Sequence, residues 1–235
     1  MSNKVHYREC DACDHGSADV VARFKGERWT PLCGSCWQRA ALEARKTGET
    51  TPETYATEWL ADVVRSMEKP CSALSDLVEE HNDGAPLTVC TDGPSSSVLT
   101  GSEAGGEETV RRLGVGIKPC FGSSLSVGLA WKDFAEEELR RAYSHVFAVS
   151  SRAAGDEKVV LCVDSPAQAL AFRVLYTRGN IDWLIDWDAV ARSYAGVGVG
   201  LLSGVTLLSG FDVPCLTLWD AAVVGKCGFD PLRVE

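Results

Sequence analysis

The pattern of hydrophobic and polar positions predicts a chain that mixes short strands with amphipathic helices. Alternating or short apolar runs predict a hairpin from 19–24 and 28–32, followed by further strands along the rest of the chain. Apolar residues recurring every three or four positions predict helices. The predicted strands cover 86–91, 123–130, 145–151, 159–164, 196–202, 204–208 and 215–220, and the predicted helices cover 33–46, 50–69, 72–84, 131–144, 165–179 and 186–196.

Residues that commonly begin or end helices stand at the ends of two predicted helices. Ser165 and Asp186 stand where helix N-caps are expected, Pro166 follows the first of them, and Gly179 stands at the end of that helix. Because strands and helices do not alternate as βαβ units, the expected fold class is α+β. We expect a small N-terminal zinc-binding module (1–48, knuckle-hairpin-helix), a helical connector (49–84), and an α+β domain (85–235) with a mostly antiparallel sheet and packed helices.

Charge narrows the classes of function. The net charge is -10, yet residues 1–46 carry a net +2 and the remainder carries -12. This balance disfavours a general nucleic-acid-binding protein. A phosphate contact would therefore be expected only in the N-terminal module, and a weak nucleic-acid adaptor stays open as an alternative there. Its candidate cations are Arg8, Arg23, Lys25, Arg28 and Arg39.

The predicted compartment follows from the N-terminus and the cysteines. The first ten residues are polar, without the apolar run of a signal peptide, and no stretch reaches the length of a membrane span. We expect a cytoplasmic or otherwise reducing compartment, with no membrane partner. In that setting six cysteines that stand singly are expected to be reduced and mostly buried, namely Cys71, Cys90, Cys120, Cys162, Cys215 and Cys227.

Four further cysteines form the strongest chemical signal. Cys10, Cys13, Cys33 and Cys36 have the spacing C-x2-C-x19-C-x2-C, which is typical of zinc sites. Each CxxC turn can direct two thiolates at one ion, and two turns complete a tetrahedron. The expected cofactor is one structural Zn²⁺, because protein thiolates fill all four positions and none is left open for a substrate.

Four cysteines in two CxxC pairs also occur in sites other than zinc sites. Iron–sulfur clusters are also bound by four cysteines, and a redox-active CxxC pair is a third alternative. Redox motifs of the thioredoxin type come singly beside a βαβ pattern, which is not predicted here. His6 and His15 could replace a ligand but are more simply surface residues. Over residues 6–46, the order knuckle, hairpin and knuckle at a helix start resembles the treble-clef zinc fingers.

The C-terminal part carries a second resemblance. The segments KPCFGSSLSVGLAWKDF, IDWDAVARSYAGVGV and LWDAAVVGKCGFDP, beginning at Lys118, are similar to a family of uncharacterised bacterial and phage proteins. That family's layout resembles the ADP-ribosyltransferase fold, which implies a split sheet that binds NAD. The fold implies a His or Arg, a hydroxyl residue and a late Glu. The matching positions here hold Cys90, Ser124 or Ser126, and Asp220, which depart from that pattern.

Other catalytic sets can be assembled only loosely. Ser150, His145 and Asp164 contain the residue types of a hydrolase triad, but no GxSxG motif accompanies them. His81 is expected at a helix end. The acidic residues Asp182, Asp186 and Asp188 stand among Trp183 and Trp187. Helix capping and buried tryptophans explain that cluster more simply than a sugar site does.

These observations lead to one hypothesis with two alternatives. We expect a non-catalytic, zinc-stabilised protein, of a kind that phages encode, which acts through a protein partner or through self-assembly. If phage-encoded, it would work in the virion or in the host cytoplasm. The first alternative is an NAD-consuming enzyme or toxin-type effector with a lid at 92–108. The second is the nucleic-acid adaptor.

Overall fold

The computed structural model describes residues 9–13, 17–24, 27–49, 52–91, 123–140, 142–151, 158–177, 179, 184–224 and 226–233. Two antiparallel or mixed sheets with packed helices make up these regions, which confirms the predicted α+β class. The segment 92–108, predicted as a lid, lies outside the described residues. Within them, no helix is long and apolar enough to cross a membrane.

A three-stranded antiparallel sheet forms the N-terminal part. Strands β1 (Val20–Arg23) and β2 (Thr30–Leu32) make the predicted hairpin, and helix α1 (Gly34–Thr47) follows. The third strand, β3 (Glu53–Ala56), pairs with β1 and was not predicted. The prediction of one helix over 50–69 is therefore wrong in its first part. The backbone of these residues is instead hydrogen-bonded to β1, which lies about thirty positions away in sequence.

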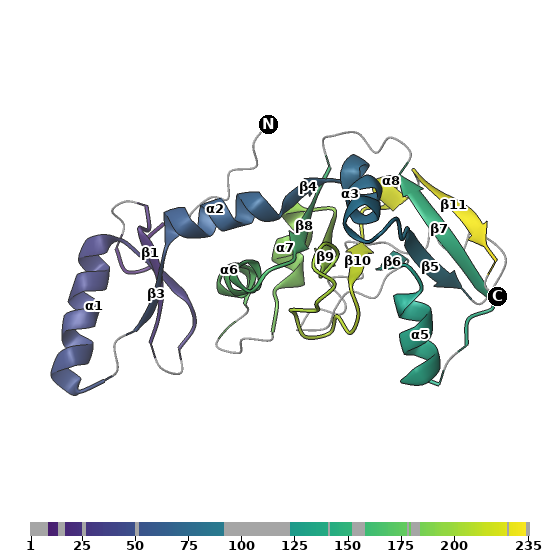
Figure 1. Cartoon of the computed structure of the whole chain (residues 1–235). Coiled ribbons are helices and arrows are strands. Elements are labelled where there is room, and N and C mark those ends of the chain that lie inside the picture. The colour runs from purple at the N-terminus through teal and green to yellow at the C-terminus, as the bar shows by residue number, and fades with distance from the viewer. Residues whose placement is uncertain are drawn as a thin grey trace.

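The connection to the rest of the chain contains no loop residues. Helix α2 (Thr57–Met67) begins directly after β3, and β4 (Glu68–Pro70) begins directly after α2. Strand β4 then pairs with the edge of the second sheet. Figure 1 shows the small sheet and α1 at one end of the molecule, with α2 spanning the distance to the large sheet.

The second sheet has eight strands in the order β11-β7-β5-β6-β10-β9-β8-β4. Only β8 and β9 pair in parallel, so the sheet is mostly antiparallel as predicted. Both of its edge strands carry a proline, Pro70 in β4 and Pro231 in β11, which limits pairing with further strands. The remaining strands are β5 (Leu87–Thr91), β6 (Ser123–Val127), β7 (His145–Ser151), β8 (Val159–Val163), β9 (Gly196–Val199), β10 (Cys215–Leu218) and β11 (Cys227–Leu232).

Helices cover both faces of this sheet. The 3-10 turn η1 (Cys71–Ala73) and α3 (Leu74–His81) bury one face, together with α8 (Ala221–Val224). Helices α2, α6 (Pro166–Tyr176) and α7 (Trp187–Ser193) bury the β8–β9–β10 part of the other face. Helix α5 (Ala130–Glu137) packs against β5 and β6.

Two of the predicted N-caps are confirmed by hydrogen bonds. The Gln168 amide donates to Ser165 Oγ (3.3 Å), and the Ala189 amide donates to Asp186 Oδ1 (3.0 Å). Three predictions about element boundaries and strands are wrong. Helix α5 ends at Glu137 rather than at 144, β11 was missed, and 204–208 is not a strand. Gly200 has φ of 69° and packs against the Val205 backbone, so the chain turns back there.

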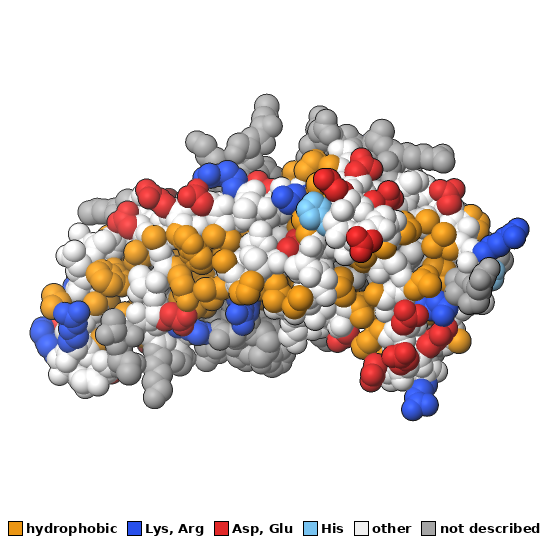
Figure 2. Space-filling model, in the orientation of Figure 1, with side chains coloured by type: hydrophobic (Ala, Val, Ile, Leu, Met, Phe, Trp, Pro, Cys, Tyr) orange, Lys and Arg blue, Asp and Glu red, His pale blue; other side chains and the backbone are white. Residues whose placement is uncertain are grey.

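An apolar cluster joins the small sheet to the rest of the molecule. Leu60 of α2 is fully buried in a cluster with Val21 of β1 and Trp29 just before β2, and with Ala171 and Val174 of α6. The rings of Tyr55 and Trp59 extend this cluster. The centroid of the Tyr55 ring lies 5.5 Å from the ring centroids of both Trp29 and Trp59. Figure 2 shows a band of hydrophobic side chains running over this part of the visible face.

Truncating the centre of this cluster should destabilise the protein. Leu60→Ala removes a side chain with no solvent exposure, so the free energy of unfolding should fall by about 2–5 kcal/mol in chemical denaturation. Leu42→Ala is the matched control, because Leu42 lies on α1 with 55% of its surface exposed. Its effect should stay within about 0.5 kcal/mol. Equal effects of the two substitutions would contradict the assignment of Leu60 to the junction.

Candidate metal centre

The four predicted ligands come from two turns that the small sheet holds together. Cys10 and Cys13 lie on a turn closed by the Cys13 amide, which donates to the Cys10 carbonyl (3.4 Å). The Asp11 amide of the same turn donates to the Pro31 carbonyl of β2 (3.0 Å). Cys33 is the N-cap of α1, and Cys36 lies in its first turn. The hairpin therefore brings the two CxxC pairs together, as their spacing predicted.

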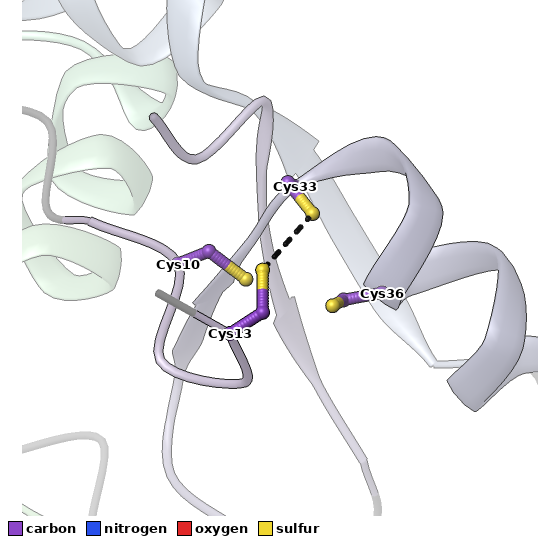
Figure 3. A group of neighbouring side chains, drawn as sticks. All are labelled: Cys10, Cys13, Cys33 and Cys36. Atoms are coloured by element: carbon purple, nitrogen blue, oxygen red, sulfur yellow. Dashed lines mark hydrogen bonds between the residues drawn. The ribbon is translucent and has the colours of Figure 1, made fainter. Parts of the chain in front are cut away.

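The four sulfur atoms converge. All four Sγ atoms lie within 4.8 Å of one another, and Cys13 Sγ lies 3.8 Å from Cys33 Sγ. Figure 3 shows the four side chains directed at a common centre. Zinc–sulfur bonds of ~2.3 Å in a tetrahedron would separate the sulfur atoms by about 3.8 Å. The sulfur spacing is thus compatible with one tetrahedral ion, and Cys10 and Cys36 are each only 5% exposed.

Proximity changes the acidity of these thiols in opposite directions. The hydrogen bond from the Cys33 backbone lowers the pKa of Cys10 to about 6. Hydrogen bonds with the Cys13 and Cys33 side chains raise the pKa of Cys36 to about 12. Four thiolates so close together would repel one another strongly unless a cation neutralised them. The donor set therefore suits a thiophilic divalent ion.

Of the other described cysteines, Cys71, Cys162 and Cys215 are buried, and Cys90 and Cys227 are half-buried. Burial raises the pKa of both Cys71 and Cys90 to about 11, and it also raises the pKa of Cys162 and Cys227. Cys215 is 2% exposed, and Cys120 lies outside the described residues. In the described part of the chain, only the Cys10 group brings three or more His, Cys, Asp or Glu ligand atoms together.

Ser126, one of the candidate catalytic hydroxyls, is buried inside the fold. Its side chain is 1% exposed and lies 3.2 Å from the Thr88 hydroxyl. Its Oγ also accepts a hydrogen bond from the Trp131 amide (3.3 Å), in the first turn of α5. These contacts fix α5 to the sheet. Ser124 lies in β6, but its side chain is outside the described part.

Asp220, the candidate late acid, stabilises the end of the sheet. Its carboxylate pairs with Lys158 (2.7 Å) and accepts hydrogen bonds from the amides of Ala222 and Val223 at the start of α8. Burial alone would raise the pKa of Asp220, but the contacts with Lys158 and with these two amides outweigh it, so the pKa is lowered.

The loose triad is not assembled. His145 and Ser150 belong to the same strand, β7, and point to opposite faces because they are five positions apart. Asp164 follows β8, where it accepts a hydrogen bond from the Leu202 amide (3.0 Å). Four strands separate β7 from β8 in the sheet, which corresponds to roughly 24 Å.

The acid–tryptophan cluster also has a structural explanation. Asp186 caps α7, and Trp187 is 4% exposed among the rings of Phe172, Phe211 and Trp219. Asp182 and Trp183 lie outside the described residues.

His81 lies in the last turn of α3, as predicted, with its Nδ1 2.8 Å from the Leu77 carbonyl oxygen.

Several candidate phosphate-binding cations already have partners. Arg23 pairs with Glu53 (3.2 Å) and lies over the Trp29 ring, and Arg28 pairs with Asp11 (3.2 Å). The Arg39 guanidinium lies 3.7 Å from Cys36 Sγ, where it can donate to the sulfur. Arg8 and Lys25 are outside the described residues, as are His6 and His15.

Replacing Asp220 should lower stability in a pH-dependent way. Asp220→Ala removes the ion pair and two capping hydrogen bonds, so the free energy of unfolding near neutral pH should fall by about 1–2 kcal/mol. Because the folded-state pKa is lowered, the wild-type advantage is present above the unfolded pKa and is lost as the pH falls through the folded one. Urea unfolding at neutral and acidic pH measures this. A difference independent of pH would contradict the ionic role.

Comparison with known proteins gives this chain no family: no protein-family model matches it, and neither a curated protein nor a solved structure does. The resemblance of the segment from Lys118 onward therefore remains a prediction from its motifs. The assignment of the four cysteines as a possible metal site depends only on the convergence of their sulfur atoms.

Proposed function

We propose that Cys10, Cys13, Cys33 and Cys36 hold one structural Zn²⁺ ion, and that this chain is a non-catalytic protein acting through a protein partner or self-assembly. The convergence of four thiols within 4.8 Å carries the proposal. With four protein ligands, a tetrahedral ion has no open position for a substrate or water. The ion would supply folding free energy instead of chemistry.

The sulfur spacing supports a single ion over an iron–sulfur cluster. A cluster places several iron and sulfide atoms between its cysteine ligands, so those ligands stand well apart. Here every pair of ligand atoms lies within 4.8 Å, which leaves room for one ion. A reducing compartment, such as the cytoplasm of a cell or of a phage host, would keep the four thiols available for it.

The burial and the existing partners of the candidate catalytic residues Ser126 and Asp220 support a non-catalytic role. Ser126 is buried and hydrogen-bonded, and Asp220 is engaged by Lys158 and by the start of α8. An NAD-consuming site would need a hydroxyl and an acid that can reach the substrate. The ion pairs of Arg23 and Arg28 likewise weaken the case for a nucleic-acid adaptor.

We propose the outer face of α1 as the contact surface for a protein partner. Leu42 is 55% exposed, and the residues three or four positions away on the same face include Arg39, Arg45 and Lys46. Lys46 also pairs with Glu43 (2.6 Å). An apolar side chain surrounded by cations fits a partner that presents a hydrophobic residue among carboxylates.

Metal analysis tests the zinc site. Purified wild-type protein and a Cys90→Ser control should each carry one zinc ion per chain by elemental mass spectrometry, because Cys90 lies in β5, away from the cluster. Cys33→Ser should bind zinc weakly and unfold more easily, because one thiolate is lost. Full zinc content in Cys33→Ser, or iron with acid-labile sulfide in the wild type, would contradict the proposal.

Three assays separate the functional alternatives. Zinc-loaded protein incubated with labelled NAD should release no nicotinamide; release that is lost in Asp220→Ala would instead establish an enzyme. Binding to an acidic partner should weaken in Leu42→Glu, which introduces a repulsive carboxylate on α1. Tight, salt-sensitive binding to nucleic acid would favour the adaptor instead.

A further inference from the structure

Asp19 makes contact with the first residue of two helices at once. Its carboxylate Oδ2 accepts a hydrogen bond from the amide of Gly34, the first residue of α1 (2.7 Å). Its backbone carbonyl accepts hydrogen bonds from the amide and the hydroxyl of Thr57, the first residue of α2 (both 3.0 Å). A single residue therefore connects the cysteine-bearing helix with the helix that leads to the large sheet.

On the α1 side, Asp19 supplies a missing cap. The N-cap of α1 is Cys33, which makes no side-chain capping hydrogen bond, so the start of the helix takes an acceptor from a distant residue. A carboxylate at a helix N-terminus is favoured both by the hydrogen bond and by the helix dipole. The turn that Asp19 fixes carries Cys33 and Cys36, two of the four proposed ligands.

On the α2 side, the same residue anchors a helix that has no cap of its own. The N-cap position, Ala56, offers no side-chain hydrogen bond. Thr57 is 6% exposed, and its hydroxyl reaches both the Ala18 and the Asp19 carbonyls. Three residues further along, Leu60 enters the cluster with Ala171 and Val174 of α6. The position of the α2 N-terminus thus decides how this cluster packs.

We propose that Asp19 positions the ligand-bearing start of α1 and couples zinc binding at the four cysteines to the packing of α2 on α6. This inference rests on the proposed zinc site. Zinc would hold Cys33 and Cys36 in place, the fixed α1 turn would hold Asp19, and Asp19 would hold Thr57. Since coupling of this kind is reciprocal, loosening α2 must weaken zinc binding by the same factor as zinc strengthens α2 packing.

Removing the ion therefore has an effect outside the small sheet. If the module were an independent unit, chelation would increase amide hydrogen exchange only around the cysteines and α1. With coupling through Asp19, exchange also increases over Thr57–Met67 and over the α6 residues that contact α2. Strands of the large sheet remote from α2, such as β5 and β7, keep their protection and serve as the internal reference.

The test measures zinc affinity by competition with a chromophoric chelator, on the full chain, together with amide exchange. Asp19→Ala should weaken zinc binding by about tenfold, in line with residues that orient metal ligands. Asp19→Asn, which keeps a neutral acceptor, should lose less. Thr57→Val removes one hydroxyl that touches no ligand, and it should still weaken zinc binding by about a factor of three. Asp62→Ala, an exposed α2 aspartate paired with Arg65, is the control and should bind zinc as the wild type does.

The outcomes separate the coupling from the zinc site itself. Wild-type protein that binds no zinc would overturn both proposals. Wild-type affinity in Thr57→Val, together with unchanged α2 exchange after chelation, would overturn the coupling alone and leave Asp19 as a local cap of α1. If Asp19→Ala does not fold, Asp19→Asn and Thr57→Val decide the question, because Asp19→Asn keeps a side-chain acceptor for the Gly34 amide and Thr57→Val keeps the hydrogen bond from the residue 57 amide to the Asp19 carbonyl.

Discussion

Four neighbouring sulfur atoms lie in the buried part of the N-terminal module, and as thiolates they would repel one another without a bound cation. Among the described residues, the buried cluster around the site consists of Cys10, Ala22, Leu32 and Cys36, so half of these side chains are proposed ligands. A three-stranded sheet with one helix has too small a core to be stable by apolar burial alone, and small domains of this size usually rely on a metal or disulfides. A cation that neutralises the four thiolates would therefore stabilise the hairpin, α1 and the attached strand β3.

The module is also part of a larger packing arrangement. Strand β3, helix α2 and strand β4 follow one another without loop residues, so one continuous segment belongs to the small sheet, to the α6 contact and to the edge of the large sheet. Leu60 connects the apolar side chains of the small sheet and α6. Asp19 accepts hydrogen bonds from the first residues of α1 and α2, through its carboxylate and its backbone carbonyl respectively. The expected boundary at residue 48 falls before β3, although β3 completes the small sheet through its pairing with β1.

The sequence predicted features whose cause is local. The CxxC spacing predicted that the four thiols meet, and Ser165 and Asp186 were recognised as caps because their partners lie three residues away. It did not predict β3, whose pairing partner is distant, nor Asp19, an exposed aspartate whose acceptor role for Gly34 depends on the folded hairpin. The loose triad likewise depends on the tertiary fold. The residue types of a triad are present, but His145 and Ser150 point to opposite faces of β7, and Asp164 follows β8, which the strand order places far from β7.

X-ray absorption spectroscopy at the zinc edge tests the central claim most directly, because it reports the ligands of the bound ion without requiring crystals. The account predicts a single shell of four sulfur scatterers at ~2.3 Å. A shell that includes nitrogen or oxygen donors at about 2.0–2.2 Å would show that the ion is not enclosed by Cys10, Cys13, Cys33 and Cys36, and would contradict a closed structural site.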